Sequence, residues 1–182
     1  MRNFKACLFV IAVVVAGALA GCSATSTKSA DVTAAVRTSL DQAGLKDVTV
    51  SQDRDKGVIT LGGHVAMDND KAQAESIAKS LAGTQVVANQ IAIIPPGAEN
   101  AAKDINSDLD KGIESNLDAA LISAKLHKNV KFTVKNHVVT LTGEVNSAAN
   151  RARAEAVASG VPNVQQVVNT LQVKDQKATS AN

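Results

Sequence analysis

The stretch VVTLTGEV, residues 138–145, has a close copy 80 positions earlier in the chain, VITLGGHV at residues 58–65. The same offset relates Asn89 to Asn169, outside the copied stretch. Upstream of the stretch the offset drifts by one position, which is what a change in loop length between two copies of one module would leave. We therefore interpret the chain as the duplication of a module of about 65 residues.

The copied stretch alternates like a half-buried strand, with an apolar residue at every second position. Gly63 in the first copy and Gly143 in the second fall on the apolar face. A glycine on the inner face of a strand weakens it, so its recurrence indicates that another backbone approaches closely. We expect the approaching element to be the alanine-rich helix that follows the strand.

Apolar residues at helical spacing on both sides of this strand predict two helices in each copy. In the first copy Asp31 is the expected cap of one helix and Asp68 of the other, and each helix ends at a glycine. Turn residues 53–57 join the copied strand to an earlier one, so the pair forms a hairpin. A third strand, residues 87–93, follows the second helix by a right-handed parallel crossover.

The fold class is therefore α+β: two tandem α-β-β-α-β modules, each a three-stranded mixed sheet with two helices on one face. The second copy has a longer first helix, which Gly112 bends or interrupts, and Ser147 caps its second helix. Pro95-Pro96-Gly97 separates the copies. The predicted segments are signal peptide 1–22, flexible tether 23–30, first domain 31–94, linker 95–104, second domain 105–174 and disordered tail 175–182.

Residues 1–22 have the pattern of an export signal, in which Arg2 and Lys5 precede a short apolar run. The run is shorter than the roughly 20 residues of a membrane-spanning helix. It ends in Leu-Ala-Gly-Cys22, which resembles the lipobox of bacterial lipoproteins and implies that Cys22 becomes the lipidated first residue. Ordinary signal-peptide cleavage, with Cys22 incidental, is the alternative. By the same resemblance, Ser23 implies an anchor in the outer membrane, with the protein facing the periplasm.

The composition argues against several other classes of protein. Outside the leader, 17 basic residues balance 17 acidic ones, so the body lacks the excess positive charge that nucleic acid requires. Cys22 is the one cysteine left after leader removal, and no intrachain disulfide is expected. His64, His127 and His137 lack the converging ligands of a metal site, and no catalytic pattern occurs. We expect neither an enzyme nor a cofactor or bound metal.

The copied strand, the alanine-rich helix and the closing segment GVPNVQQVVN, residues 160–169, resemble the BON domain family of bacterial envelope proteins. The second copy has all of these features, whereas the first has Thr84 where the family has a valine-type residue. The resemblance covers nearly all of residues 31–174 and implies a non-enzymatic protein. Lipid-anchored members are associated with envelope integrity and with anionic-phospholipid binding through the first helix of the second copy. A soluble member is associated with osmotic stress and chaperoning.

The second copy has a group of basic residues that could contact anionic lipid: Lys125, His127, Lys128, Lys131 and Lys135. Each basic residue near an anionic membrane contributes roughly 1 kcal/mol. The preceding helix carries acids that would repel such a membrane: Asp104, Asp108, Asp110, Glu114 and Asp118. Positive residues at a helix end also complement the helix dipole without any ligand.

Asn89 and Asn169 occupy the same point of the two copies, which we place at the start of the third strand. They fit either a ligand contact or side chains that satisfy backbone groups at a loop boundary.

Two functional hypotheses follow from the resemblance. The first is a lipid-anchored envelope protein that binds anionic phospholipid of the outer membrane and supports the envelope under osmotic stress. The second is a periplasmic chaperone-like protein that binds unfolded outer-membrane or secreted clients. Neither hypothesis includes a nucleic-acid partner.

Overall fold

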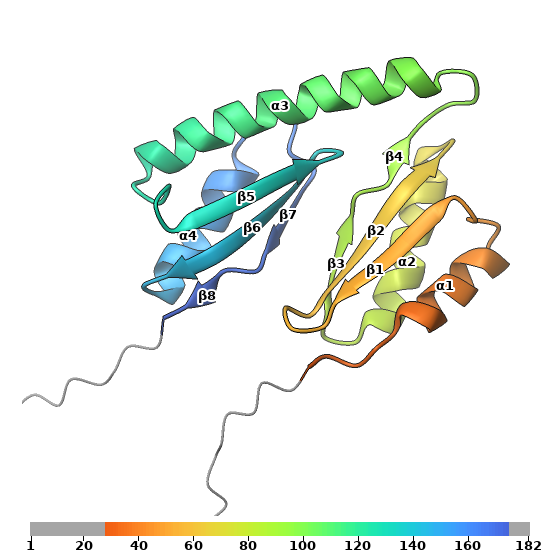
Figure 1. Ribbon diagram of the computed structural model, residues 1–182, viewed down its shortest axis with the longest axis horizontal. Coiled ribbons are helices and arrows are strands. Elements are labelled where there is room, and N and C mark those ends of the chain that lie inside the picture. The colour runs from red at the N-terminus through yellow and green to blue at the C-terminus, as the bar shows by residue number, and fades with distance from the viewer. Residues whose placement is uncertain (1–27, 175–182) are drawn as a thin grey trace, which may run out of the picture.

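The computed structural model describes residues 28–174, which form two modules of one plan (Figure 1). The first contains α1 (Thr33–Gln42), β1 (Val48–Asp53), β2 (Val58–Val65), α2 (Asp68–Ala82), β3 (Val86–Asn89) and β4 (Ala92–Ile93). The second contains α3 (Glu99–Ser123), β5 (Val130–Lys135), β6 (Val138–Val145), α4 (Ala148–Ser159), β7 (Gln166–Asn169) and β8 (Gln172–Val173). The predicted α+β class and the tandem repeat are confirmed. The predicted signal peptide with Cys22 and the predicted tail 175–182 lie outside the described residues.

Both sheets are mixed and have the same pairing. β1 and β2 form an antiparallel hairpin with Val48 opposite Gly63, and β2 pairs in parallel with β3 and then with β4. In the second module β6 pairs in the same way with β5, β7 and β8, and Val130 lies opposite Gly143. The hairpin and the parallel crossover are as predicted, and the predicted third strand is present as two short segments along one neighbour.

Alanines bring the second helix of each module close to its sheet. Ala74, Ala78 and Ala82 of α2 are buried, and Ala154 and Ala158 of α4 are fully buried. The long aliphatic side chains of the two cores come from the first helix and the central strand: Val36, Leu40, Ile59 and Leu61; Ile113, Leu117, Leu121, Val139 and Leu141. Burial of this apolar surface holds both helices against one face of each sheet.

A backbone does approach the recurrent glycine of β2 and β6 closely, but it is not that of the alanine-rich helix. A Cβ on Gly63 would lie 2.0 Å from the carbonyl oxygen of Asp47, and one on Gly143 would lie 2.4 Å from that of Asn129. Both carbonyls belong to the residue just before the first strand of the hairpin. The expectation that the alanine-rich helix packs on the glycine is therefore wrong, because the antiparallel partner strand begins there.

The first helix of the second module is 25 residues long, whereas α1 has 10 residues. α3 continues through Gly112 without interruption, and residues 99–104, assigned to the linker from sequence, are its first turns. Its C-terminal half is buried on its own sheet, whereas Ile105 and Leu109 are 59% and 38% exposed. The N-terminal half of α3 thus extends beyond its own module toward the first one (Figure 1).

Two of the three predicted capping side chains accept a backbone N–H at the start of their helix. The Ser147 hydroxyl accepts a backbone N–H of the first turn of α4 at 3.2 Å. The Asp31 carboxylate accepts the N–H of Thr33, the first residue of α1, at 3.1 Å, as predicted for a cap. The capping position of α2 is Met67, so the prediction for Asp68 is wrong by one position. Asp68 is the first helical residue instead, where its carboxylate interacts favourably with the helix dipole.

The end of the predicted tether is hydrogen-bonded to the β1–β2 hairpin. The Ser29 N–H donates to the carbonyl of Arg54 at 2.9 Å, and the Arg54 Nε donates back to the Ser29 carbonyl at 2.7 Å. The Gln52 amide donates to the Ala30 carbonyl at 2.7 Å and accepts the Val32 N–H at 3.2 Å. The chain therefore enters the first module along this hairpin rather than as a loose segment.

The modules meet where β3 and β7 lie side by side (Figure 1). Val58, Ala88, Val138 and Val168 form a separate buried cluster at this junction. Val138 and Val168 follow Val58 and Ala88 by the same 80 positions that relate the two copies. The modules therefore meet through equivalent residues, as in an approximately two-fold contact.

The Gln166 side chain closes the outer edge of β3. Its Nε2 donates to the Val87 carbonyl at 2.7 Å, and its Oε1 accepts the Asn89 N–H at 2.9 Å. Both backbone groups point away from β2, so the amide occupies the place of a neighbouring strand at an otherwise open edge. Asn136 adds a further link between modules by donating to the Gln90 carbonyl at 2.7 Å.

Candidate functional site

The five basic residues suggested as a lipid contact are exposed but do not form one cluster. Lys125, His127 and Lys128 lie in the loop between α3 and β5, and Lys131 and Lys135 occupy alternate positions of β5. At about 3.3 Å per residue, the six-residue β5 places Lys135 roughly 15 Å from the loop. We refer to Lys125, His127, Lys128 and Lys131 as the basic loop. Lys135 belongs to a different part of the surface.

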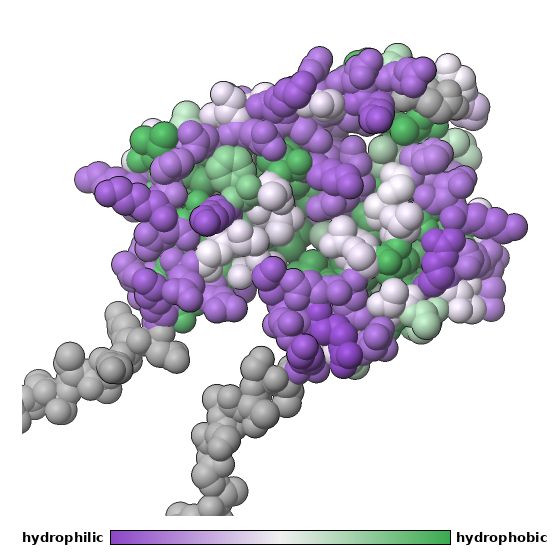
Figure 2. Space-filling view, in the orientation of Figure 1, coloured by the Kyte–Doolittle hydropathy of each residue, from purple (hydrophilic) through white to green (hydrophobic). Residues whose placement is uncertain are grey.

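The acids of α3 are arranged around the helix and do not all act alike. Asp118 lies 2.8 Å from Nδ1 of His127, so this carboxylate binds the basic loop itself. Asp104 and Asp108 are exposed, and hydrophilic side chains cover most of α3 in Figure 2. Asp110 is partly buried and binds the turn between β5 and β6. The exposed face of the helix would therefore repel an anionic surface, whereas the basic loop at its C-terminal end would not.

The two remaining histidines lie at the ends of strands. His64 is exposed at the end of β2, and the buried Nε2 of His137 has no hydrogen-bond partner among residues 28–174. The described part of the chain contains no group of three or more His, Cys, Asp or Glu side chains that could hold a metal ion. Within the same residues, no helix combines the length and apolar character needed to cross a bilayer.

Asn89 and Asn169 make the same contacts in their respective modules. Asn89 is 4% exposed; its Nδ2 donates to Glu75 at 2.8 Å, and its Oδ1 accepts the Ile91 N–H at 3.4 Å. The equivalent partners of Asn169 are Glu155 and the Leu171 N–H. Each asparagine ends β3 or β7 rather than starting it, and joins the second helix to the break between the two short strands. These contacts are those of a side chain that satisfies backbone groups.

Two charged side chains of α2 near Asn89, Lys71 and Glu75, have pKa values below their ordinary ones. Burial lowers the pKa of Lys71, which donates to Gln165 across the module junction at 3.3 Å. Burial also opposes the charge of Glu75, but hydrogen bonds from Asn89 and Lys79 outweigh it, and the pKa of that carboxyl lies below its ordinary value. The hydrogen bonds from Asn89 and Lys79 therefore favour the charged form of Glu75.

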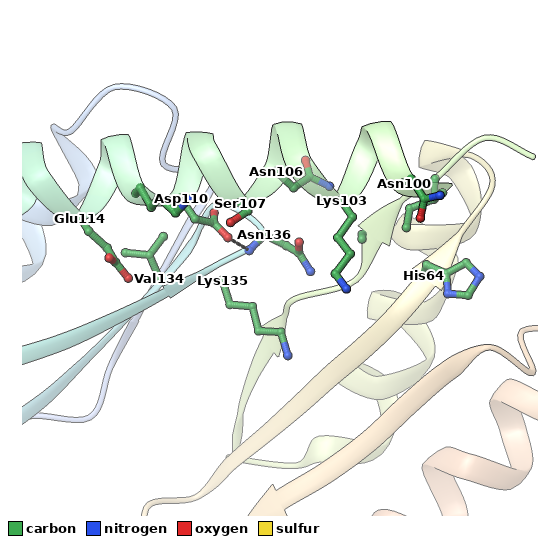
Figure 3. A pocket seen from close by; sticks show the side chains of 13 residues that line it. His64, Asn100, Lys103, Asn106, Ser107, Asp110, Glu114, Val134, Lys135 and Asn136 are labelled. Atoms are coloured by element: carbon green, nitrogen blue, oxygen red, sulfur yellow. Dashed lines mark hydrogen bonds between the residues drawn. The ribbon is translucent and has the colours of Figure 1, made fainter. Parts of the chain in front are cut away.

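A cavity of about 660 Å³ lies between the modules, under the N-terminal half of α3 (Figure 3). Lys103 of α3 and Lys135 of β5 extend into it from two sides, and His64 lies at its edge on the first module. The amides of Asn106 and Asn136 line the same space. Its volume is within the range of small-molecule sites, about 300–1,000 Å³.

The sequence contained a signal for this cavity that the prediction above did not use. Asn106 and Asp110 lie seven positions before the buried Ile113 and Leu117, so they share the core-facing side of α3. Lys103 lies a further seven positions before Asp110. Polar residues at core-facing positions indicate that this part of the helix does not cover a packed apolar surface.

Comparison with known families and relatives is consistent with the repeated plan. The model of the BON domain matches the chain twice, at residues 28–95 and 109–175. The chain is also 30% identical over 146 residues to osmotically-inducible protein Y of Escherichia coli (strain K12). The aligned residues cover 79% of this chain and 71% of that protein. The first turns of α3, residues 99–108, fall between the two matched segments.

Two solved structures of CdsD, a structural protein of the type III secretion system of Chlamydia trachomatis, show a more distant likeness. One is the C-terminal domain of CdsD, with a TM-score of 0.33 and 14% identity, over 78% of this chain and 67% of that one. The other has a TM-score of 0.35 and 13% identity, over 79% of this chain, which spans 64% of its length.

Proposed function

We infer the function from the premise that this chain belongs to the BON domain family and carries the domain twice. We propose a non-catalytic protein of the bacterial cell envelope that acts under osmotic stress. It is anchored through Cys22 to the outer membrane, faces the periplasm, and contacts anionic phospholipid through the basic loop. The observation that carries the lipid contact is the position of that loop, which is exposed at the end of α3, away from the module junction.

The anchor would hold the folded body near the bilayer. Lys28, the first described residue, lies six positions after Cys22. An extended chain spans at most about 3.5 Å per residue, so this segment reaches about 20 Å. Cys22 carrying two or three acyl chains would hold the protein firmly, because each buried methylene contributes about 0.8 kcal/mol. Within that reach, a weak contact of the body with headgroups is sufficient, since the anchor raises its effective concentration.

The basic loop has the composition of a membrane contact. Lys125 and Lys128 are exposed, and the neighbouring Ile122 is 56% exposed at the end of α3. Basic residues attract anionic headgroups while an exposed apolar side chain can enter the interface. The Asp118 carboxylate lies 2.8 Å from Nδ1 of His127, so the lysines supply the net attraction of the loop.

A vesicle flotation experiment tests the lipid contact on the chain from Ser23 to Asn182, which retains both modules. We expect recovery on anionic vesicles to exceed that on neutral ones, and the triple variant K125Q/K128Q/K131Q to lose this excess. The matched control K46Q/K56Q/K174Q removes the same charge from exposed sites elsewhere and should float like the original chain. Equal recovery of the original chain on both kinds of vesicle would reject the proposal.

The anchor has an independent test. The intact mass of the mature protein, purified from membranes, should correspond to a chain that begins at Cys22 and carries acyl groups, and Cys22→Ala should move the protein to the soluble periplasmic fraction. A mature mass without acyl groups would make the protein a soluble one, as in the alternative cleavage.

One observation favours the chaperone-like alternative. Ile105 and Leu109 lie one helical turn apart on α3, and both remain exposed in the described chain. Such side chains can bind apolar segments of an unfolded protein. We expect the chain to delay aggregation of an unfolded outer-membrane protein, and I105S/L109S to abolish the delay. No delay at molar excess of the original chain would remove this alternative.

A further inference from the structure

The N-terminal half of α3 has no packing role that explains its residues. Residues 99–108 fall outside both matched domain segments, and they have no counterpart in the shorter α1. Its inner face carries Lys103, Asn106 and Asp110 where the same face of the C-terminal half carries buried aliphatic residues. A helix that only bridged two modules would gain more from apolar residues there, so the polar face indicates a polar occupant.

The space below this face is bounded by both modules. Lys135 and Asn136 close it from the β5–β6 hairpin, and His64 and Ala92 from the first module. In Figure 3 the side chains of Lys103 and Lys135 both extend into the gap between α3 and β2. An occupant that filled this space would touch α3 and both modules at once.

The charges in this cleft favour an anion. Among the described side chains, neither Lys103 nor Lys135 has an ion-pair partner, whereas Lys111, which also lines the cavity, binds Asp108 at 3.1 Å. The Asp110 carboxylate is already engaged by two backbone N–H groups of the hairpin turn. Glu114 adds a counter-charge, but it lies at the other end of the wall, beside Val134 (Figure 3). Two lysines that line one cleft repel each other, and an oxyanion between them would offset that repulsion.

We propose that this inter-module cleft binds the phosphate ester of a small polyol, with Lys103 and Lys135 on the phosphate and the Asn106 and Asn136 amides on the hydroxyl groups. Amides both donate and accept, as hydroxyl groups require, and lysine is a common phosphate ligand. The phosphate ester can be a free metabolite or the headgroup of a lipid. The four proposed contacts belong to the second module, and one of them, Asn136, also binds the Gln90 carbonyl of the first module.

The experiment uses the chain from Ser23 to Asn182, labelled with ¹⁵N, and titrates it with glycerol 1-phosphate, with inorganic phosphate and with glycerol. We expect saturable shifts at Asn106, Asn136 and their neighbours with glycerol phosphate, weaker binding of inorganic phosphate, and no comparable shifts with glycerol. K103Q/K135Q should bind glycerol phosphate at least about tenfold more weakly, and K103R/K135R should restore part of the affinity. The matched control K128Q/K131Q should bind as the original chain does. All four positions are exposed, so the variants should keep the original circular dichroism spectrum.

Vesicle flotation of K103Q/K135Q identifies the source of the phosphate. Retained flotation together with loss of glycerol phosphate binding indicates a free ester, and joint loss indicates a headgroup. Failure of the lipid proposal would show in the basic-loop variant without affecting this titration. The absence of saturable shifts with glycerol phosphate, or equal affinity of K103Q/K135Q, would overturn the proposal for the cleft.

Discussion

The Asp110 carboxylate of α3 accepts the backbone N–H of Asn136 at 2.8 Å, and its second oxygen accepts that of His137 at 2.8 Å. Asn136 and His137 both have positive φ, +47° and +65°, as the two central residues of a tight hairpin turn of type I′ do. The helix thus satisfies both N–H groups of a turn made from non-glycine residues. The same turn carries Lys135 and Asn136 into the cleft between the modules.

We expect Asp110→Ala to lower the free energy of unfolding by about 1–3 kcal/mol, because two partly buried N–H groups lose their acceptor. Urea denaturation of the mature chain measures this change. Asp108→Ala is the matched control, since Asp108 is exposed and makes a surface ion pair with Lys111. Its effect should stay within about 1 kcal/mol. An equal effect of the two substitutions would show that the turn does not depend on Asp110.

Gly63→Ala and Gly143→Ala should each destabilise their module by at least about 2 kcal/mol, since an L residue in the left-handed region costs about 1–2 kcal/mol and the new Cβ meets a backbone carbonyl. Gly112→Ala is the contrasting variant, because it lies in α3 with nothing within 4 Å of the new Cβ. It should raise the free energy of unfolding by up to about 1 kcal/mol. Thermal unfolding should show a lower midpoint temperature for the two strand variants and a higher one for Gly112→Ala.

The repeat, the element order and the recurrent glycine could be predicted because they depend on local patterns. Alternation predicts a strand, and a duplicated strand predicts a duplicated module. The partner of the glycine could not be predicted, since strand alternation shows which face Gly63 occupies but not which carbonyl the hairpin places there. The drift of one position has a structural cause: in the second module the hairpin loop is two residues shorter, 136–137 against 54–57, and the loop after the first helix is one residue longer, 124–129 against 43–47.

The candidate site was harder to predict than the fold because its residues are distant in sequence. Lys135 could be grouped with the basic loop by proximity along the chain, but the direction of β5 carries it to the module junction. Lys103 lay in what the sequence suggested was a linker. The position of Gln166 in a short strand gave no indication that its amide would reach across to β3. Contacts between modules require the relative position of the two copies, which periodicity does not contain.

The stability of the first module should depend on pH through Glu75. Because its hydrogen bonds hold the folded pKa below the unfolded value of about 4.5, the stabilisation is present above that pH and is lost as the pH falls through the folded pKa. Urea denaturation at a series of pH values should show Glu75→Gln less stable than the original chain at neutral pH, with the difference shrinking in acid. Asn89→Ala should reduce the same pH dependence, because it removes the main donor to the carboxylate. A difference that stays constant across the acid range would contradict this linkage.

Gln166→Ala should uncouple the modules. The Val87 carbonyl and the buried Asn89 N–H would lose their partner at the edge of β3, at a cost of about 1–3 kcal/mol. Because the substitution leaves both module cores intact, we expect NMR signals of the first module to disappear at a lower temperature than those of the second, whereas the original chain unfolds more nearly together. Gln165→Ala is the matched control: this neighbour accepts one long bond from Lys71, and its loss should change the unfolding profile little. Equal profiles for the two variants would mean that the valine and alanine side chains of the junction hold the modules together without the amide bridge.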